Sequence, residues 1–291
     1  MITVNREVGE RRIVGWVRFS VLMCPEEAGH FAIGKNGTYE EYRKQLFQLD
    51  RLEAKLFLFA NLVLPSISNQ EYPIQEDWFK LLVLASEYCP TEIAQQLRII
   101  CASYPWVTLR FVPAQKGVSG RLLKKEIADF SAPGDVVFSF RMDDDDALGK
   151  FFISEALSFC REEFDGCALS LSLGLAGLWD VENKVFQGFF ELHRPKIALG
   201  LGVVSVYRKG FRSIAEGGNH MLIDRRFPTI ISGKKHTFLR TLHMHGDQFV
   251  NKSAIQPERR LRRFQEGRTV SAREVEDYVH IADALLPPSA S

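Results

Sequence analysis

Four consecutive aspartates, Asp143–Asp146, interrupt a strongly apolar part of the sequence. They follow the apolar run 136–142, and an apolar pattern with helical spacing resumes from Phe151. This order predicts a buried strand, a sharp acidic turn and a helix. Adjacent carboxylates repel one another, so such a cluster indicates a hard divalent cation, for which carboxylate oxygens are preferred ligands.

Four kinds of site are compatible with this cluster. Carboxylates at a helix N-terminus are stabilised by the helix dipole, although one or two would suffice. A calcium loop beginning at Asp144 is disfavoured because Leu148 and Phe152 stand where the loop needs oxygen ligands. The run Asp143-Asp144-Asp145 also satisfies the Asp-x-Asp pattern of phosphotransferases with an aspartyl nucleophile, but such families usually carry it on their first strand.

The fourth kind is the Asp-x-Asp site of nucleotide-sugar glycosyltransferases. There, Mg²⁺ or Mn²⁺ held by the acids bridges the two phosphates of the donor and neutralises charge on the leaving diphosphate. The cluster lies in the middle of the chain, after roughly three strand–helix units, and this position favours the fourth kind.

The residues before the cluster alternate between strand-like and helical patterns. Capping-box patterns at Thr38…Glu41 and Asp50…Glu53 mark two helix starts, and the second helix is expected to stop near Pro65. This alternation predicts a largely parallel sheet, in which ligands bind beyond the carboxyl ends of the strands. The strand-like runs are 13–22, 78–85, 106–112 and 136–142, and further helical patterns cover 91–101 and 119–130.

The second half of the chain has the pattern of a mixed sheet with hairpins, fused to the first half. A short helix is expected around 274–285. The Arg-rich segment 259–273 is either a solvated helix face or a surface that docks weakly on anionic lipid or an acidic partner. The strand-like runs are 168–178, 185–192, 197–207, 227–231 and 237–244.

Composition excludes some classes of protein. The net charge of +1, from 37 basic and 36 acidic residues, argues against a dedicated nucleic-acid-binding protein. Five cysteines without a Cys-x-x-Cys pair indicate reduced core residues. The start of the chain has no secretory apolar core, and the longest uncharged run, 166–179, is too short to span a bilayer. We therefore expect a cytoplasmic protein.

Short motifs spread over residues 13–250 resemble a bacterial rhamnosyltransferase family with a GT-A-like glycosyltransferase fold. The aspartate cluster with its preceding arginine is the most specific of them. The chain departs from the family after the late His-Gly, where Asp247 stands in place of an expected Asn. The matching residues are Arg18-Phe19-Ser20, Asp50-Arg51-Leu52-Glu53, Leu58-Phe59, Leu64-Pro65-Ser66-Ile67 with Gln70, 81–86, 141–148, 198–201, Gly218-Asn219-His220 and 243–246.

The resemblance implies an α/β, GT-A-like fold, in which a mainly parallel Rossmann-type sheet is flanked by helices and followed by a mixed β second half. It implies one domain at 13–255, with 13–160 binding the nucleotide sugar and 161–255 the acceptor. Residues 256–291 would be a C-terminal Arg-rich and helical extension. The implied activity is metal-dependent transfer of a sugar, rhamnose by the family's label, from a nucleoside diphosphate. The acceptor would be a cell-envelope or exopolysaccharide glycan, free or lipid-linked, at the inner membrane face.

The resemblance also implies roles for the acids. Asp143 would contact the donor's ribose or the shell of the metal, and Asp145 would be the chief ligand of Mn²⁺ or Mg²⁺. Asp146 is expected to cap the following helix. His243 and His245 would share one face of a strand, and His245 is our choice as the late histidine that GT-A enzymes commonly add to the metal.

Several other residues are candidates for the donor site. Arg18 and Lys116 can meet diphosphate oxygens, since Lys116 precedes a helix whose first amides are free donors. Arg141 either holds the acidic turn by charge pairing or is a surface residue at a strand end. His220 lies in a glycine-containing loop that either closes on donor or acceptor or is a surface turn.

An inverting transfer needs a general base for the acceptor hydroxyl. Asp180, Glu191 and His193 stand at ends of second-half strands, and Asp180 is favoured because it ends an apolar run. For any one of them, a solvated turn residue is the more common role. Two alternatives to a transferase stay open: the aspartyl-nucleophile phosphotransferase, and a catalytically silent transferase fold that binds glycans or acts as a scaffold.

Overall fold

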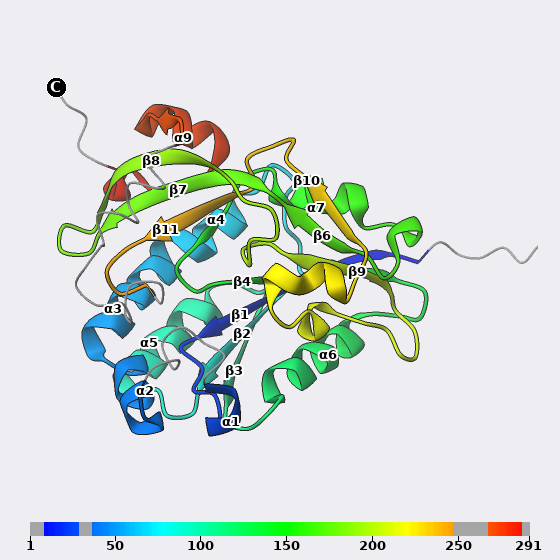
Figure 1. Cartoon of the computed structure of the whole chain (residues 1–291), viewed down its shortest axis with the longest axis horizontal. Helices are drawn as coiled ribbons and strands as arrows, with labels where there is room; N and C mark the ends of the chain where they lie inside the picture. Colours follow the sequence, from blue (N-terminus) through cyan, green and yellow to red (C-terminus); the bar gives the residue numbers. More distant parts are fainter. Residues whose placement is uncertain (1–8, 29–36, 247–266, 287–291) are drawn as a thin grey trace, which may run out of the picture.

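A seven-stranded sheet is the central layer of the computed structural model, which describes residues 9–28, 37–246 and 267–286 (Figure 1). Its strand order is β10-β6-β9-β4-β1-β2-β3. The four strands from β4 to β3 are parallel, whereas β9 runs antiparallel to β4 and β6. The strands are β1 (Arg11–Phe19), β2 (Phe79–Ser86), β3 (Val107–Val112), β4 (Val136–Met142), β6 (Ala168–Leu171), β9 (Gly202–Val206) and β10 (Thr229–Ser232).

Helices cover both faces of this sheet. One face buries apolar side chains of α3 (Leu49–Leu58), α5 (Thr91–Ala102) and α7 (Phe152–Phe159). The other face packs against α6 (Val118–Phe130) and the 3₁₀ helices η3 (Ile214–Glu216) and η4 (His220–Arg225). The predicted α/β class with a mainly parallel sheet flanked by helices is therefore confirmed.

A second sheet, with strand order β12-β8-β7-β11-β5, carries most of the mixed β half. Its apolar face packs against α9 (Ala272–Tyr278) and the 3₁₀ helix η5 (Asp283–Leu285). Residues 267–286 thus share a core with the sheet, and the predicted boundary at 255 stays a prediction. The strands are β5 (Ala147–Leu148), β7 (Leu173–Asp180), β8 (Val185–His193), β11 (Phe238–Leu242) and β12 (Thr269–Val270).

The long helical run at 49–68 differs from its prediction at both ends. It begins at Leu49 after Gln48, without a side-chain cap, so the predicted capping box at Asp50 is wrong. The run also passes Pro65, because the amide of Leu64 bonds to the carbonyl of Phe59 five residues back. This wider turn accommodates a residue that has no N–H to donate. The run comprises α3, the π-helical turn η1 (Phe59–Val63) and α4 (Leu64–Ser68).

Other boundaries follow their predictions more closely. The capping box at Thr38 is confirmed at the start of α2 (Tyr39–Leu46), which follows the short α1 (Pro25–Ala28). Most of the Arg-rich segment 259–273, and the departure at Asp247, lie outside the described residues. In the described part of the chain, no helix combines the length and apolar character needed to cross a bilayer.

The strand order reverses at β1, and this reversal positions the site. From β1 the chain adds β2 and β3 on one side and then returns to place β4 on the other side. In open α/β sheets, ligands bind beyond the carboxyl ends of the strands at such a point. The aspartate cluster directly follows β4 and therefore stands at this crevice.

Candidate active site

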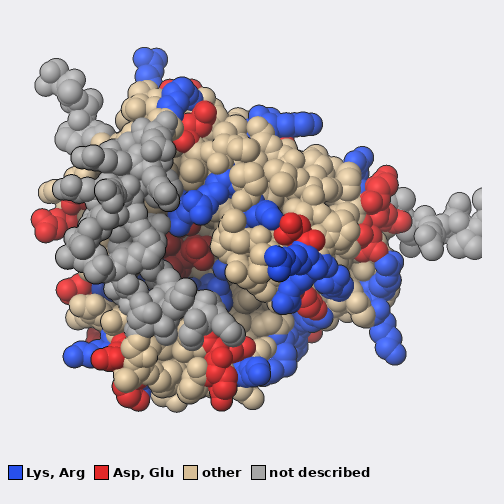
Figure 2. All heavy atoms as spheres, viewed as in Figure 1, with Lys and Arg blue, Asp and Glu red and all other residues tan. Residues whose placement is uncertain are grey.

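A pocket opens at the carboxyl ends of β1 and β4. Figure 2 shows acidic atoms at the floor of a recess on this face, with basic side chains beside them. Helices α2 and α3 and strand β11 supply further walls. The lining residues that carry charge are Arg18, Arg51, Lys55, Asp143, Asp144, Asp145, Asp146 and Arg240. Four acids and four bases thus face one small volume.

The four aspartates have unequal surroundings. Asp143 is exposed, whereas Asp144, Asp145 and Asp146 are 2%, 8% and 5% exposed. Burying a carboxylate is costly unless it is paired and hydrogen-bonded. The structure must therefore supply partners for three of the four side chains.

Lys55 is the partner of two of them. Its Nζ donates to Oδ1 of Asp144 and lies 3.2 Å from Oδ2 of Asp145. The same Oδ2 accepts a hydrogen bond from Nε2 of His243 at 3.1 Å. Asp145 therefore lies between the ammonium group of Lys55 and the buried imidazole of His243, two residues that are far apart in the sequence.

These contacts separate the protonation equilibria of the three buried acids. Burial opposes ionisation of Asp145, but the charge of Lys55 and the hydrogen bond from His243 outweigh it, so the pKa of Asp145 lies well below its usual value. Burial raises the pKa of Asp144 to about 6, although Lys55 opposes the shift. Burial and the charges of Asp145 and Asp143 hold the pKa of Asp146 well above its usual value. Asp145 is thus the buried member that stays a carboxylate most readily.

Asp146 does not cap the following helix, contrary to the prediction. Its Oδ1 accepts a hydrogen bond from the backbone N–H of Thr241 at 2.7 Å, which ties the acidic turn to β11. Gln70 caps α7 instead, because its Oε1 accepts a hydrogen bond from the backbone N–H of Ile153, in the first turn, at 3.1 Å. Ser66 accepts from the N–H of Leu148 at 3.1 Å. The motif at 64–70 therefore holds the segment that follows the acids.

Helix α3 brings two buried cations to the pocket. Arg51 and Lys55 are 3% and 4% exposed and lie one turn apart. Nη1 of Arg51 donates to Oγ of Ser20 at 3.0 Å and to the carbonyl of Leu46 at 3.1 Å. Sequence reasoning assigned no role to either, although Lys55 falls three residues after Leu52 on the apolar face. A cation on the buried face of a helix is the signal that would have found them.

Ser20, directly after β1, has a left-handed backbone conformation with φ of 46°. A non-glycine residue in this region costs about 1–2 kcal/mol. The hydrogen bond from Arg51 and the burial of Ser20 hold the conformation in place. Such strain gathers at functional sites, and Ser20 itself lines the pocket.

The predicted metal ligands are only partly brought together. His243, not His245, contacts Asp145, because β11 ends at Leu242 and the alternation of a strand does not extend to His245. Within the described ranges, no three His, Cys, Asp or Glu side chains are placed to hold a metal ion by themselves. Asp143, Asp145 and His245 therefore do not form a closed three-ligand site.

A second group of charged residues surrounds His220. The charges of Arg141, Asp143 and Arg194 all act on its ring. The Nδ1–H of His220 donates to the carbonyl of Lys196 at 2.6 Å, which leaves Nε2 as the unprotonated nitrogen of the neutral ring. Burial is the largest cause that lowers the pKa of His220, so its ring is neutral at pH 7.

Of the predicted site residues, Arg18, Asp143 and Asp145 line the pocket, and the others do not: Arg141, His220, His245, Lys116, Asp180, Glu191 and His193. Lys116 lies in the loop before α6, near Glu26. The carboxylate of Asp180 closes the β7–β8 turn, where it accepts from the amides of Glu182 and Asn183 and from two side chains. These hydrogen bonds lower the pKa of Asp180 and make it a poor general base.

The two remaining candidates for the base are also engaged in contacts. Glu191 pairs with His236 at 3.0 Å and Arg268 at 3.3 Å, and these contacts lower its pKa. His193 contacts the buried hydroxyl of Ser172 at 3.0 Å. These contacts give Glu191 and His193 a structural role on strand β8, away from the aspartate cluster.

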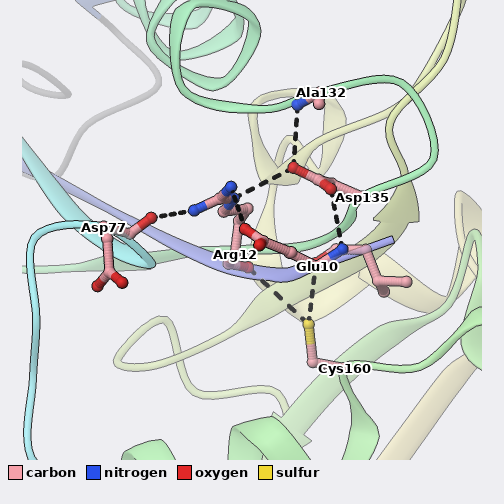
Figure 3. A network of polar contacts seen from close by, with 7 residues as sticks. Glu10, Arg12, Asp77, Ala132, Asp135 and Cys160 are labelled. Atoms are coloured by element: carbon pink, nitrogen blue, oxygen red, sulfur yellow. Dashed lines mark hydrogen bonds and ion pairs between the residues drawn. The ribbon is translucent and has the colours of Figure 1, made fainter. Parts of the chain in front are cut away.

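The opposite ends of β1 and β4 are fixed by a polar network (Figure 3). Asp135 accepts from the amides of Glu10 and Ala132 and from Nε of Arg12, at 2.9, 2.9 and 3.1 Å. Arg12 also donates to the carbonyl of Asp77, and the thiol of Cys160 donates to the carbonyl of Val136 at 3.3 Å. Burial raises the pKa of this thiol to about 12. The network sets the register of the strands that carry Ser20 and the acids.

Several solved structures are similar to this chain at low sequence identity. A crystal structure of TarS from S. aureus matches with 11% identity and a TM-score of 0.37, covering 79% of this chain and 60% of that one. The mannosyltransferase PcManGT from Pyrobaculum calidifontis, in complex with GDP-Man and Mn²⁺, matches with 13% identity and a TM-score of 0.40, covering 81% and 59%. The chain thus spans about three fifths of the length of these structures.

A third structure, of 4-diphosphocytidyl-2C-methyl-D-erythritol synthase, matches with 12% identity and a TM-score of 0.36, covering 88% of this chain and 98% of that one. No curated protein matches the sequence. A family model described as "Putative rhamnosyl transferase" matches residues 12–254, which include both strands of the site and all four aspartates. The chain belongs to this rhamnosyl transferase family.

Proposed function

We propose that this protein is a glycosyltransferase that takes its sugar from a nucleoside-diphosphate donor and uses a divalent cation. The observation that carries the proposal is the position of Asp143 and Asp145 beyond β4, in a pocket that also contains Arg18 and Arg240. Carboxylates for a cation and guanidinium groups for phosphate oxygens are the two kinds of ligand that a metal–diphosphate complex requires.

The acids present fit a cation that arrives with its substrate. Mg²⁺ usually takes one or two carboxylates and completes its shell with substrate phosphates and water, so it does not need a three-residue cage. Asp143 is exposed, and Asp145 favours the ionised form. Oδ2 of Asp144 and Oγ1 of Thr241 line the pocket, buried and without a hydrogen-bond partner among the described residues. The cation, Mn²⁺ or Mg²⁺, would neutralise charge on the leaving diphosphate.

The protein's own residues would orient the diphosphate, fix Asp145 and exclude water. Arg18, at the carboxyl end of β1, and Arg240, on β11, would orient the diphosphate from two sides of the pocket. Lys55 and His243 would keep Asp145 ionised and fixed. The floor formed by β5 and β11 would keep water away from the buried acids.

For an inverting transfer, His220 is the base that the geometry favours. Its tautomer is fixed by Lys196, burial lowers its pKa and so favours the neutral ring, and no hydrogen bond to Nε2 is present among the described residues. Asp143 lies within electrostatic range and would stabilise the imidazolium that forms after proton transfer. This assignment replaces Asp180, whose carboxylate is engaged in the turn.

The family's description supports rhamnose as the sugar. For a rhamnosyl transferase we propose a glycan acceptor of the cell envelope or of an exopolysaccharide, free or lipid-linked. Action in the cytoplasm, with weak contact at the inner membrane face, follows as part of the same proposal and would involve the segment 259–273.

Thermal unfolding with a panel of nucleoside diphosphates, each with and without Mn²⁺, tests the proposal. A ligand at 100 times its Kd stabilises the native state by about 2.7 kcal/mol. We expect one nucleotide to raise the Tm when Mn²⁺ is present. Asp143→Asn should abolish this rise without lowering the Tm of the free protein, because Asp143 is exposed.

A matched control is Asp129→Asn, another exposed acid that lies on α6 far from the pocket. It should leave the nucleotide response unchanged. If no nucleotide shifts the Tm with any metal, the transferase proposal is wrong. Capture of a phosphoryl group on an aspartate would instead favour the phosphotransferase.

A further inference from the structure

The acid cluster already contains a cation that belongs to the protein. The ammonium of Lys55 contacts both Asp144 and Asp145, and the three side chains are 5%, 3% and 11% exposed. A buried lysine keeps its charge only where carboxylates compensate for lost hydration. Lys55 therefore occupies the inner side of the cluster as a counter-ion.

The helix holds this counter-ion in place. Lys55 lies on α3 between the buried Leu52 and Leu56, whose side chains pack in the core below the sheet. Arg51, one turn earlier, is fixed by hydrogen bonds to Ser20 and Leu46. The ammonium cannot move into solvent without disturbing this packing, so it stays beside the two acids.

Lys55 also restricts the oxygens that a metal ion can use. Oδ2 of Asp145 already accepts from both Lys55 and His243, and Oδ1 of Asp144 is bonded to Lys55. A divalent cation at the outer side of the cluster would meet Asp143, the remaining oxygen of Asp145 and Oδ2 of Asp144, with an ammonium of like charge close behind. Carboxylates opposed by a fixed positive charge make a weak cation site.

A diphosphate changes this balance. It brings negative charge and further oxygen ligands, so the cation gains both attraction and a fuller coordination shell. We propose that Lys55 is a positioning residue that makes cation binding depend on the donor: the free protein binds a divalent cation poorly, and the cation binds together with the diphosphate. This inference rests on the proposed function, since it concerns the same pocket.

Binding of Mn²⁺ alone, measured by the paramagnetic resonance signal of free Mn²⁺, tests the inference without any activity assay. We expect Lys55→Met to bind Mn²⁺ at least tenfold more tightly than the wild-type protein, because a fixed positive charge is lost. Lys55→Arg keeps the charge and should bind as weakly as the wild-type protein. Lys125→Met, which removes an exposed lysine of α6, is the matched control and should change nothing.

The wild-type protein gives a second measurement that does not depend on the folding of a variant. Mn²⁺ affinity should rise at least tenfold when the nucleoside diphosphate that stabilises the protein is added. Equal Mn²⁺ affinity with and without nucleotide would overturn the inference, as would a folded Lys55→Met that binds Mn²⁺ no more tightly.

The two proposals can fail separately. A metal-dependent nucleotide response together with unaltered Mn²⁺ binding in Lys55→Met rejects the role of Lys55 and leaves the transferase intact. Tighter Mn²⁺ binding in Lys55→Met without any nucleotide response supports Lys55 as a counter-ion that weakens the cation site, but it rejects the transferase and, with it, the dependence of cation binding on the donor.

Discussion

Replacing Gln70 should destabilise the protein although the residue lies outside the pocket. Its side chain is 7% exposed and links two segments that are far apart in the sequence. Nε2 donates to the carbonyls of Ser66 and Gly149 at 2.8 and 2.9 Å, and Oε1 accepts from the N–H of Ile153 at 3.1 Å. The N-cap residue of α7, Phe151, provides no side-chain cap, so the cap comes from Gln70.

The magnitude follows from the groups that lose their partner. In Gln70→Met the volume is nearly kept, but the buried N–H of Ile153 is left unsatisfied, which costs about 1–3 kcal/mol. Gln70→Ala adds a cavity, so we expect about 2–4 kcal/mol in total. For a chain of this size, each kcal/mol lowers the Tm by roughly 2 °C.

Urea unfolding followed by circular dichroism measures these losses, and Tm values from calorimetry check them. The neighbouring Asn69→Ala is the matched control. Asn69 is exposed and also bonds to a helix carbonyl, so its loss should stay within about 0.5 kcal/mol. If Gln70→Met is as stable as Asn69→Ala, the capping role of Gln70 is refuted.

Three further predictions concern single positions. Gly200→Ala should lower the free energy of unfolding, measured in urea, clearly more than Gly166→Ala does. Both glycines have left-handed φ (74° and 77°), but only at Gly200 would the new Cβ lie against a side chain, 2.6 Å from a ring atom of Phe152. If His220 is the base, kcat/KM should fall as the pH drops below 6.5, because burial lowers the pKa of His220 and protonation of the ring removes the base. In His220→Gln this fall of kcat/KM at acidic pH should disappear. If it is retained, His220 is not the base. Asp180→Asn should leave kcat within about twofold, because the carboxylate serves the turn; a 100-fold loss would restore Asp180 as the base.

The fold was predictable where sequence patterns are local. Buried strands such as β2 and β4 are continuous apolar runs, and the box at Thr38 uses partners three residues apart. The passage of the helix through Pro65 was not predictable in this way. It depends on a wider turn whose hydrogen bond skips one residue, and packing in the core stabilises that turn.

The position of the site could be predicted from the sequence, but the roles of its individual residues could not. The position of the four aspartates after β4 locates the pocket. Their individual roles are set by Lys55, Thr241 and His243, which lie about 90 to 100 residues away along the chain. Periodicity within one segment contains no information about such contacts. It also failed for His245, because the strand that would have aligned it ends three residues earlier.

The long sequence separation of these contacts has a consequence for synthesis on the ribosome. The acids follow β4, but the amide of Thr241 and the ring of His243 are made about one hundred residues later. Until then, Asp145 has only Lys55 and water as partners, and Asp146 has only water. Because domains generally fold as units as the chain emerges, the nascent protein should hold an open, hydrated acidic turn. The pocket would close only when β11 joins β5 and β7, late in translation.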